Sequence, residues 1–315
     1  MALLKTRRSA ALLASLPLAA LALATLAACD PAQEPGLYED QTLADPDAGK
    51  DAPDGEDPDQ PGGQNLVDFT DMNGTWALAR DFSTCVSVFG VAETRSYTLS
   101  LVQIEQTGSV LRETHEVCSL KTTPVIGLET VVPEAVFRTS NPTVVEGYVY
   151  GNRPGASYTS GPILAVWGID LLDPLRDPLP EASDPLDPRI MDADEDGMPG
   201  VTLKVGGSAC DLYVIQRDAA SVTGILQADG SIKGGGAAYT QQVVLGATNP
   251  ICGQRFETIP NPAQGYSKMV RVDRRGINLD ADGDGEVGCE ELIAAQDRVI
   301  SWRMPDENRC APAQP

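Results

Sequence analysis

Basic, histidine and aromatic residues are scarce in this sequence. Only 23 lysines and arginines oppose 45 aspartates and glutamates, so the formal net charge is −22. Nucleic-acid binding requires clustered positive charge, and this balance therefore argues against a nucleic-acid partner. The single histidine, His115, excludes metal sites that need two histidines, such as His-Glu-x-x-His. Aromatic residues make up only 5% of the chain, whereas glycine (30) and proline (24) are frequent, which favours a turn-rich β protein over a helical bundle.

Motifs of the common catalytic sites are missing as well. The sequence contains no Gly-x-Ser-x-Gly nucleophile elbow and no Walker loop. The three consecutive glycines at 234–236 lack the strand–loop–helix context of a phosphate-binding loop. A Ser-His-Asp triad would have to use His115, which we interpret as a surface residue of a strand. We therefore expect a protein that is not an enzyme.

The N-terminus has the pattern of an export signal. Three basic residues precede an apolar run over 10–28, and the run ends in Leu26-Ala27-Ala28-Cys29. This ending resembles the bacterial lipobox, in which the chain is cut before the cysteine. The resemblance implies removal of residues 1–28, a diacylglycerol on Cys29, and a lipid-anchored location in the bacterial cell envelope. An ordinary signal peptide followed by a chance cysteine is the alternative, and the choice of inner or outer membrane stays open.

An acidic segment follows the predicted lipid anchor. Residues 30–64 contain eleven acids and one base, Lys50, for a net charge of 1 − 11 = −10. Low apolar content and frequent proline predict a disordered tether over 29–64, because such a segment cannot bury enough surface to offset its ordering entropy. The remaining chain divides into a β-rich body over 65–275, with an acidic loop at 170–200, and a C-terminal part over 276–315.

Short stretches rich in valine, isoleucine, threonine and tyrosine predict about ten strands in the body. The sequence Ala228-Asp229-Gly230 between two of them predicts a hairpin. The pattern indicates a mainly β fold, an antiparallel barrel or sandwich. Gly74-Thr75-Trp76 resembles the Gly-x-Trp start of lipocalin-like barrels, which implies a carrier for a small apolar ligand. The expected strands are Trp76–Arg80, Cys85–Phe89, Ser96–Gln106, Val110–Cys118, Thr143–Tyr150, Ile163–Ile169, Val201–Val205, Leu212–Gln216, Val222–Gln227, Ser231–Ala238 and Tyr266–Val272.

Six cysteines remain after Cys29, and an even number in an exported protein predicts three disulfides. No Cys-x-x-Cys pair occurs, which argues against zinc or redox chemistry. Fifteen pairings are possible. Chain order gives the simplest one: Cys85–Cys118, Cys210–Cys252 and Cys289–Cys310.

The strongest chemical signal is the twelve-residue segment from Asp280 to Glu291. It resembles an EF-hand calcium loop, with acids at positions 1, 3 and 5, glycine at position 6, an aliphatic residue at 8 and glutamate at 12. Calcium takes six to eight oxygen ligands, and alternate short carboxylates on a curled loop supply them. The resemblance assigns as ligands Asp280, Asp282, Asp284, the backbone carbonyl of Glu286, and both oxygens of Glu291.

The surroundings of this loop depart from a complete EF-hand. A helix is expected from Glu290 to about Trp302, because its apolar residues have helical spacing and its acids lie in the first turn. The preceding segment 269–272 has a strand pattern, and Gly276 interrupts any entering helix. The loop therefore resembles an EF-hand-like or dockerin-like half, which implies calcium binding without the opening of a calcium sensor.

A second acidic loop begins at Asp192. It resembles the first half of the same motif, with candidate ligands Asp192, Asp194, Asp196 and Met198, the last through its carbonyl. Position 12 is Leu203, so an acid of the segment before it, such as Asp170, Asp173, Asp177, Asp184 or Asp187, would have to complete the site. We expect calcium to order this segment.

The sequence thus predicts a calcium-binding, membrane-anchored lipoprotein with a structural or binding function. Two other functions stay open: a lipocalin-like carrier, and a calcium-dependent module for adhesion or binding of envelope glycans.

Overall fold

The computed structural model describes residues 70–87, 91–125, 129–139, 142–182, 184–207, 210–249, 258–301 and 310. All of them belong to the compact unit 65–315. The predictions for the leader, for Cys29 and for the tether lie outside the described residues. Within the described part, no helix has the length and apolar character needed to cross a membrane.

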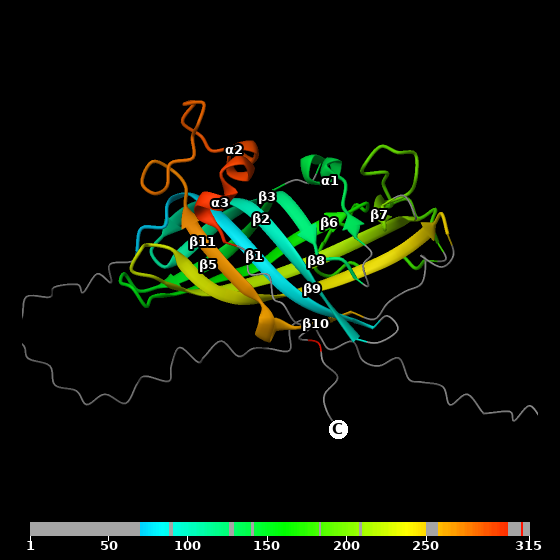
Figure 1. The fold of residues 1–315 in the computed structure, drawn as a ribbon, viewed down its shortest axis with the longest axis horizontal. Helices are drawn as coiled ribbons and strands as arrows, with labels where there is room; N and C mark the ends of the chain where they lie inside the picture. Colours follow the sequence, from blue (N-terminus) through cyan, green and yellow to red (C-terminus); the bar gives the residue numbers. More distant parts are fainter. Residues whose placement is uncertain are drawn as a thin grey trace, which may run out of the picture. The chain divides into compact units, whose positions relative to one another are not determined.

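The described chain is mainly β, as predicted, and its strands form one large antiparallel sheet (Figure 1). Eight of these strands pair in a closed circuit, because β8 pairs with both β6 and β9 and β1 pairs with both β2 and β11. The sheet is therefore ring-like. The circuit consists of β1 (Gly74–Ser87), β2 (Val91–Thr107), β3 (Val110–Thr122), β5 (Thr143–Tyr150), β6 (Ser157–Trp167), β8 (Cys210–Leu226), β9 (Ile232–Ala247) and β11 (Tyr266–Arg271).

Shorter elements attach to this ring. Strand β7 (Val201–Val205) pairs with the start of β8, β4 (Thr130–Val131) pairs with β7, and β10 (Thr258–Pro260) pairs with β1. The helical pieces are α1 (Glu134–Thr139), η1 (Pro262–Gln264), α2 (Cys289–Ala294) and α3 (Gln296–Val299). Because β6 and β7 pair with successive parts of β8, the acidic segment between them leaves the sheet as a loop.

The predicted strands are longer in the structure than in the sequence pattern. Strand β1 joins two of the expected strands into one, and β8 joins another two. The predicted hairpin at 228–230 does connect β8 to β9. Strand β9 continues nine residues beyond Ala238 to Ala247, and the strand prediction missed the signal of Tyr239, Val243 and Val244 in this stretch. Phe89, the expected end of one strand, lies outside the described residues.

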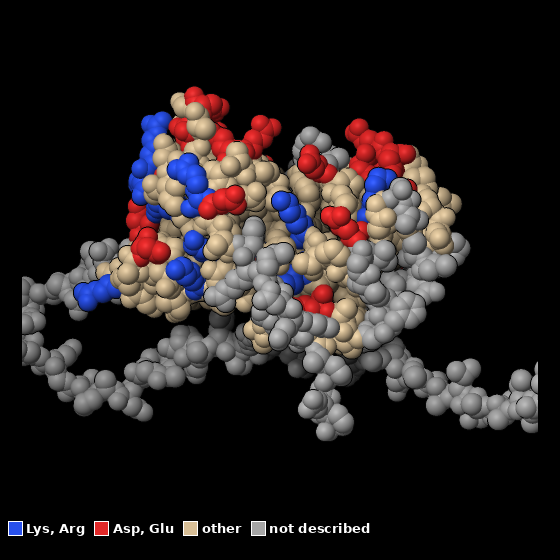
Figure 2. All heavy atoms as spheres, in the orientation of Figure 1, with Lys and Arg blue, Asp and Glu red and all other residues tan. Residues whose placement is uncertain are grey.

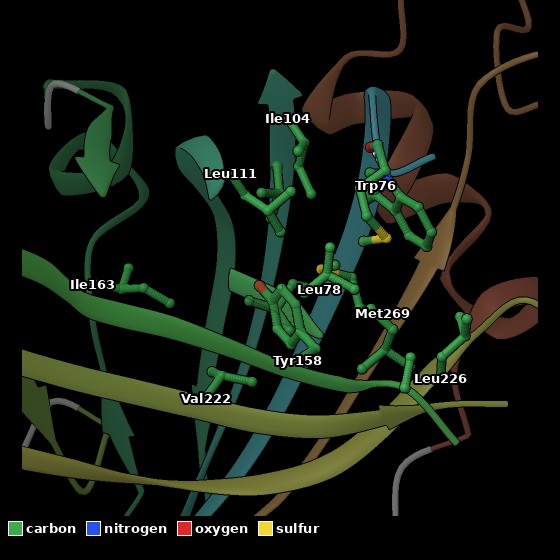
Figure 3. Packing of buried hydrophobic residues seen from close by; sticks show 14 of the residues in the cluster. Trp76, Leu78, Ile104, Leu111, Tyr158, Ile163, Val222, Leu226 and Met269 are labelled. Atoms are coloured by element: carbon green, nitrogen blue, oxygen red, sulfur yellow. Dashed lines mark hydrogen bonds between the residues drawn. The ribbon is translucent and has the colours of Figure 1, made fainter. Parts of the chain in front are cut away.

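Alternation along β1 separates the interior of the ring from its outer face. Trp76 and Leu78 join the interior core, which also holds Tyr158 and Met269 (Figure 3). The intervening Ala77 and Ala79 join a second core on the outside. Successive side chains of a strand point to opposite faces, so one strand contributes to both cores. Large residues inside and alanines outside leave room for another segment to lie on the outer face.

The C-terminal segment occupies that space. Leu279, Val287, Leu292 and Val299 are all buried against the outer face of β1 and β2. The single helix expected up to Trp302 is wrong in part, since helical geometry stops at Ala295 and α3 begins at Gln296. The break lets apolar residues of both short helices reach the curved sheet. Trp302 lies outside the described residues.

The disulfides also join the C-terminal segment to the ring. Cys85 of β1 is bonded to Cys310, and Cys118 of β3 is bonded to Cys289 at the start of α2. The predicted pairs Cys85–Cys118 and Cys289–Cys310 are therefore wrong. Chain-order pairing assumes that each disulfide closes a local loop. Packing of the C-terminal segment on the sheet instead brings together cysteines that are separated by 225 positions in one pair and by 171 positions in the other. Cys210 is disulfide-bonded as well, and Cys252 lies outside the described residues.

Candidate metal centre

The C-terminal acidic loop connects β11 to α2 and gathers its first three acids. One carboxylate oxygen from each of Asp280, Asp282 and Asp284 lies within 4.8 Å of the others. Gly283 and Gly285 have φ values of 82° and 96°, which side-chain-bearing residues rarely adopt. Gly285, the glycine expected at the sharp turn, is therefore required there. The curl of the loop brings the three carboxylates together.

Glu291 reaches back to the beginning of this loop from the first turn of α2. Its Oε1 accepts a hydrogen bond from the amide of Ala281 at 2.5 Å, and its Oε2 accepts one from Gly288 at 2.9 Å. The amides of Gly288 and Ala281 lower the pKa of Glu291, so the carboxylate is held in its charged form. The residue expected to close the ligand shell thus lies beside the residues expected to begin it.

The other expected ligand of this loop, Glu286, follows the three acids. Its amide donates to Asp284 Oδ1 at 2.8 Å, which fixes the backbone from which its carbonyl would bind an ion. Asp280 accepts from the amide of Gly283 at 2.7 Å, and its side chain is only 4% exposed. Arg274 Nη2 lies 3.3 Å from Asp280 Oδ2. A cationic side chain therefore already faces the first acid of the loop.

The second acidic loop also gathers three carboxylates. Oxygens of Asp192, Asp194 and Asp196 lie within 4.8 Å of one another. Asp192 accepts hydrogen bonds from the amides of Asp196 and Gly197 at 3.1 and 2.8 Å. Met198 donates its amide to Asp196 Oδ1 at 2.9 Å. The loop is thus curled around its own acids in the manner of the C-terminal loop, and Figure 2 shows acidic side chains gathered over both.

Asp194 is the most constrained acid of this second loop. Its Oδ2 accepts from the amide of Thr202 at 3.0 Å, while its Oδ1 is buried without a hydrogen-bond partner among the described residues. Burial raises the pKa of Asp194, and repulsion from Asp196 and Asp192 adds to the effect. A cation between the three carboxylates would relieve both penalties.

Three of the five acids that the sequence suggested for the missing twelfth position make other contacts. Leu203 is buried in β7. Asp173 accepts from the amides of Leu175 and Arg176, Asp177 accepts from the amide of Asp173, and Asp187 is ion-paired with Arg189. These three acids stabilise turns of their own segment, so each is already engaged away from Asp192.

Protein contacts hold the segment before this loop on the sheet. The buried Arg217 of β8 donates to the carbonyls of Pro174 and Asp177 at 3.0 and 2.8 Å. Ile169 and Leu171 pack against Ile215 in a small core of their own. Arginine and apolar contacts thus hold 169–177 on the sheet, and the ordering of the whole segment by calcium stays a prediction.

A buried polar group inside the ring was missed by the sequence reasoning. His115 is only 2% exposed, so its interpretation as a surface residue is wrong. It lies on the inward face of β3 with Leu111 and Glu113, because strand residues two apart share a face. Glu113 interacts with His115 Nε2 at 2.9 Å and accepts from Tyr158 at 2.9 Å and from Ser160 at 2.7 Å. A strand of alternating charged residues looked exposed, but the interior supplies partners for one of its acids.

Arg80 is a second interior residue without a sequence signal. It is 7% exposed, and its Nε has no hydrogen-bond partner among the described residues. Burial lowers the pKa of Arg80 to about 10, and the charge of Asp218 on β8 acts in the opposite direction. Its position in β1, on the same face as Leu78, is the only feature that would have predicted burial.

Comparisons with protein-family models, with curated proteins and with solved structures found no match for this chain.

Proposed function

We propose that this protein is an exported, lipid-anchored protein of the bacterial cell envelope whose folded part binds calcium at the loop from Asp280 to Glu291. The observation that carries the proposal is the convergence of three carboxylates within 4.8 Å, with the charged carboxylate of Glu291 held against the start of the loop. Hard oxygen ligands in this number and spacing suit calcium. The lipid anchor rests on the sequence ending at Cys29, and disulfides support an oxidising compartment.

The bound ion would act as a structural staple. Asp280 follows the buried Leu279, and Glu291 precedes the buried Leu292, so the two ends of the loop enter the same outer core. An ion shared by both acids would fix these ends relative to each other and offset the repulsion among the loop's acids. Cys289, within the loop, is tied to β3 by its disulfide. The disulfide therefore fixes the start of α2 to the sheet, whereas the helix that follows the loop of a calcium sensor moves when the ion binds.

The interior of the ring favours this structural function over a lipocalin-like carrier. Trp76, Tyr158 and Met269 fill the centre, together with the other buried side chains labelled in Figure 3. Sites for apolar ligands are cavities of about 300–1,000 Å³ lined by such side chains. Here the side chains contact one another and take the space that an apolar ligand would need. The loop at Asp192 is a second calcium site in this proposal, supported by the buried, unpartnered Oδ1 of Asp194.

Calorimetry on the purified chain tests the proposal. We expect calcium in the millimolar range to release or absorb heat and to raise the melting temperature, since extracellular sites bind with dissociation constants of about 10⁻⁴–10⁻³ M. The variant Glu291→Gln should lose most of this response. The neighbouring exposed Glu290→Gln is the matched control and should keep it. Equal melting temperatures with chelator and with calcium, and no heat of binding, would refute calcium binding.

A further inference from the structure

Two tyrosines stand next to each other on the outer face of β5. Tyr148 and Tyr150 alternate with the buried Gly147 and Val149, so both rings point away from the interior. The ring centroids are 6.1 Å apart and the ring planes differ by 14°. Tyr150 is 55% exposed. Two nearly parallel aromatic rings are thus presented to solvent by a rigid strand.

Strand register places hydroxyl groups beside these rings on the side of β6 and β8. Tyr148 lies opposite Thr159 of β6, which lies opposite Thr223 of β8. Tyr150 lies opposite Ser157, which lies opposite Ile225, and Ile225 is 43% exposed. We call these six residues the tyrosine face: Tyr148, Tyr150, Ser157, Thr159, Thr223 and Ile225. On the side of β6 and β8 each apolar side chain has a hydroxyl-bearing neighbour, whereas on the side of β3 Tyr148 lies opposite Val110, which is 38% exposed. The surface therefore combines apolar contact area with hydroxyl groups.

The tyrosine face is electrically balanced, although the chain as a whole has a net charge of −22. Two pairs of opposite charges lie at its border: Arg112 with Glu105 at 3.4 Å, and Lys233 with Asp229 at 4.0 Å. The exposed Glu146 and Arg153, also near the border, have opposite charges. The Tyr148 hydroxyl donates to Glu146. A surface whose charges balance gives little electrostatic attraction to a charged partner, and it fits a partner without charge.

We propose that the tyrosine face binds a neutral glycan chain. The electron-rich faces of tyrosine rings attract the C–H edges of sugar rings, and the tyrosine hydroxyls offer hydrogen bonds at the same time. The serine, the two threonines and the Glu146 carboxylate supply further donors and acceptors for sugar hydroxyls. Tyrosine gives a large contact area at low entropic cost because it has only two side-chain torsions. This inference does not depend on calcium.

Titration of the full chain with uncharged oligosaccharides tests the proposal. The probes are hexamers of β-linked glucose, of α-linked glucose and of N-acetylglucosamine, followed by calorimetry and by saturation-transfer NMR. We expect one of them to bind, and Tyr150→Ala to weaken that binding about tenfold or more. The double variant Tyr148→Ala/Tyr150→Ala should abolish it. Tyr239→Ala, a 39% exposed tyrosine on β9, is the matched control and should bind like the wild type.

Three results would overturn the proposal. One is the absence of binding by the wild-type chain to all three hexamers. Another is unchanged binding in the Tyr148 and Tyr150 variants; if chelation then removed the binding, the glycan would belong to the acidic loops. The third is self-association of the wild-type chain in sedimentation experiments that the double variant loses, which would make this face a contact between two copies. Binding that persists in chelator supports the tyrosine face even if the calcium proposal fails.

Discussion

Replacing Arg80 by methionine should stabilise the fold. The guanidinium lies inside the ring, and its Nε has no hydrogen-bond partner among the described residues. Burial lowers its pKa from 12.5 to about 10. At about 1.4 kcal/mol for each tenfold change in proton affinity, this lowering disfavours the charged form by about 3 kcal/mol. The cost is fully present below pH 10, where Arg80 is charged in both the folded and unfolded states, and it is relieved only as the pH rises from 10 toward 12.5.

Methionine keeps an unbranched side chain of similar length, so the stem of Arg80 is replaced without a large cavity. Asp218 would lose the favourable charge of Arg80, which offsets part of the gain. We therefore expect the free energy of unfolding to rise by about 1–3 kcal/mol. Urea denaturation at pH 7 with an unchanged m value measures it.

The matched control for Arg80→Met is Arg112→Met on the outer face of β3. The Arg112 side chain is 59% exposed, and its loss should change stability by less than about 0.5 kcal/mol. Asp218→Asn alone should destabilise the protein, because it leaves Arg80 without its opposing charge. A loss of stability in Arg80→Met larger than in the control would refute the reasoning, since the arginine would then be satisfied in its buried position.

Three further predictions concern the loop and the ring. Arg274→Gln removes the cation beside Asp280 and should raise calcium affinity about two- to fivefold in calorimetry, while a weaker affinity would refute competition. Gly147→Ala places a methyl group 2.3 Å from Glu113 Oε1 and should cost about 1–3 kcal/mol in urea denaturation; unchanged stability would show that Glu113 moves freely. Serine at both Cys118 and Cys289 should cost about 2–4 kcal/mol of stability and should also weaken calcium binding, whereas unchanged affinity would separate the loop from its disulfide.

Local features of the fold could be predicted from the sequence. Strands appeared where β-branched and aromatic residues cluster, and the hairpin at 228–230 followed from its turn residues. The two groups of three carboxylates were also predictable, because the acids are two positions apart on loops that glycines allow to curl. In each case the determining contacts span only a few residues of the chain.

Long-range features could not be predicted in this way. Closure of the ring depends on pairs such as β1 with β11, whose residues are almost 200 positions apart. The disulfide partners of Cys85 and Cys118 follow from the position of the C-terminal segment on the outer face of β1 and β2. The alternation of large Trp76 with small Ala77 leaves room for a segment on that face, but it does not specify which segment lies there. Burial of His115 and Arg80 likewise depends on which face of a strand the closed ring turns inward, and polar residues there give no hydrophobic signal.

The two acidic loops differ in how much of a calcium shell each can supply. The C-terminal loop supplies its own closing carboxylate, because α2 begins at Cys289 and places Glu291 against the amide of Ala281. The loop at Asp192 ends instead in β7, where position 12 is a buried leucine and the strand runs away from the acids. More protein oxygens per ion give tighter binding in sites of this kind. The C-terminal loop should therefore fill first, and a second, weaker phase in a calcium titration should disappear in Asp194→Asn while the first phase remains.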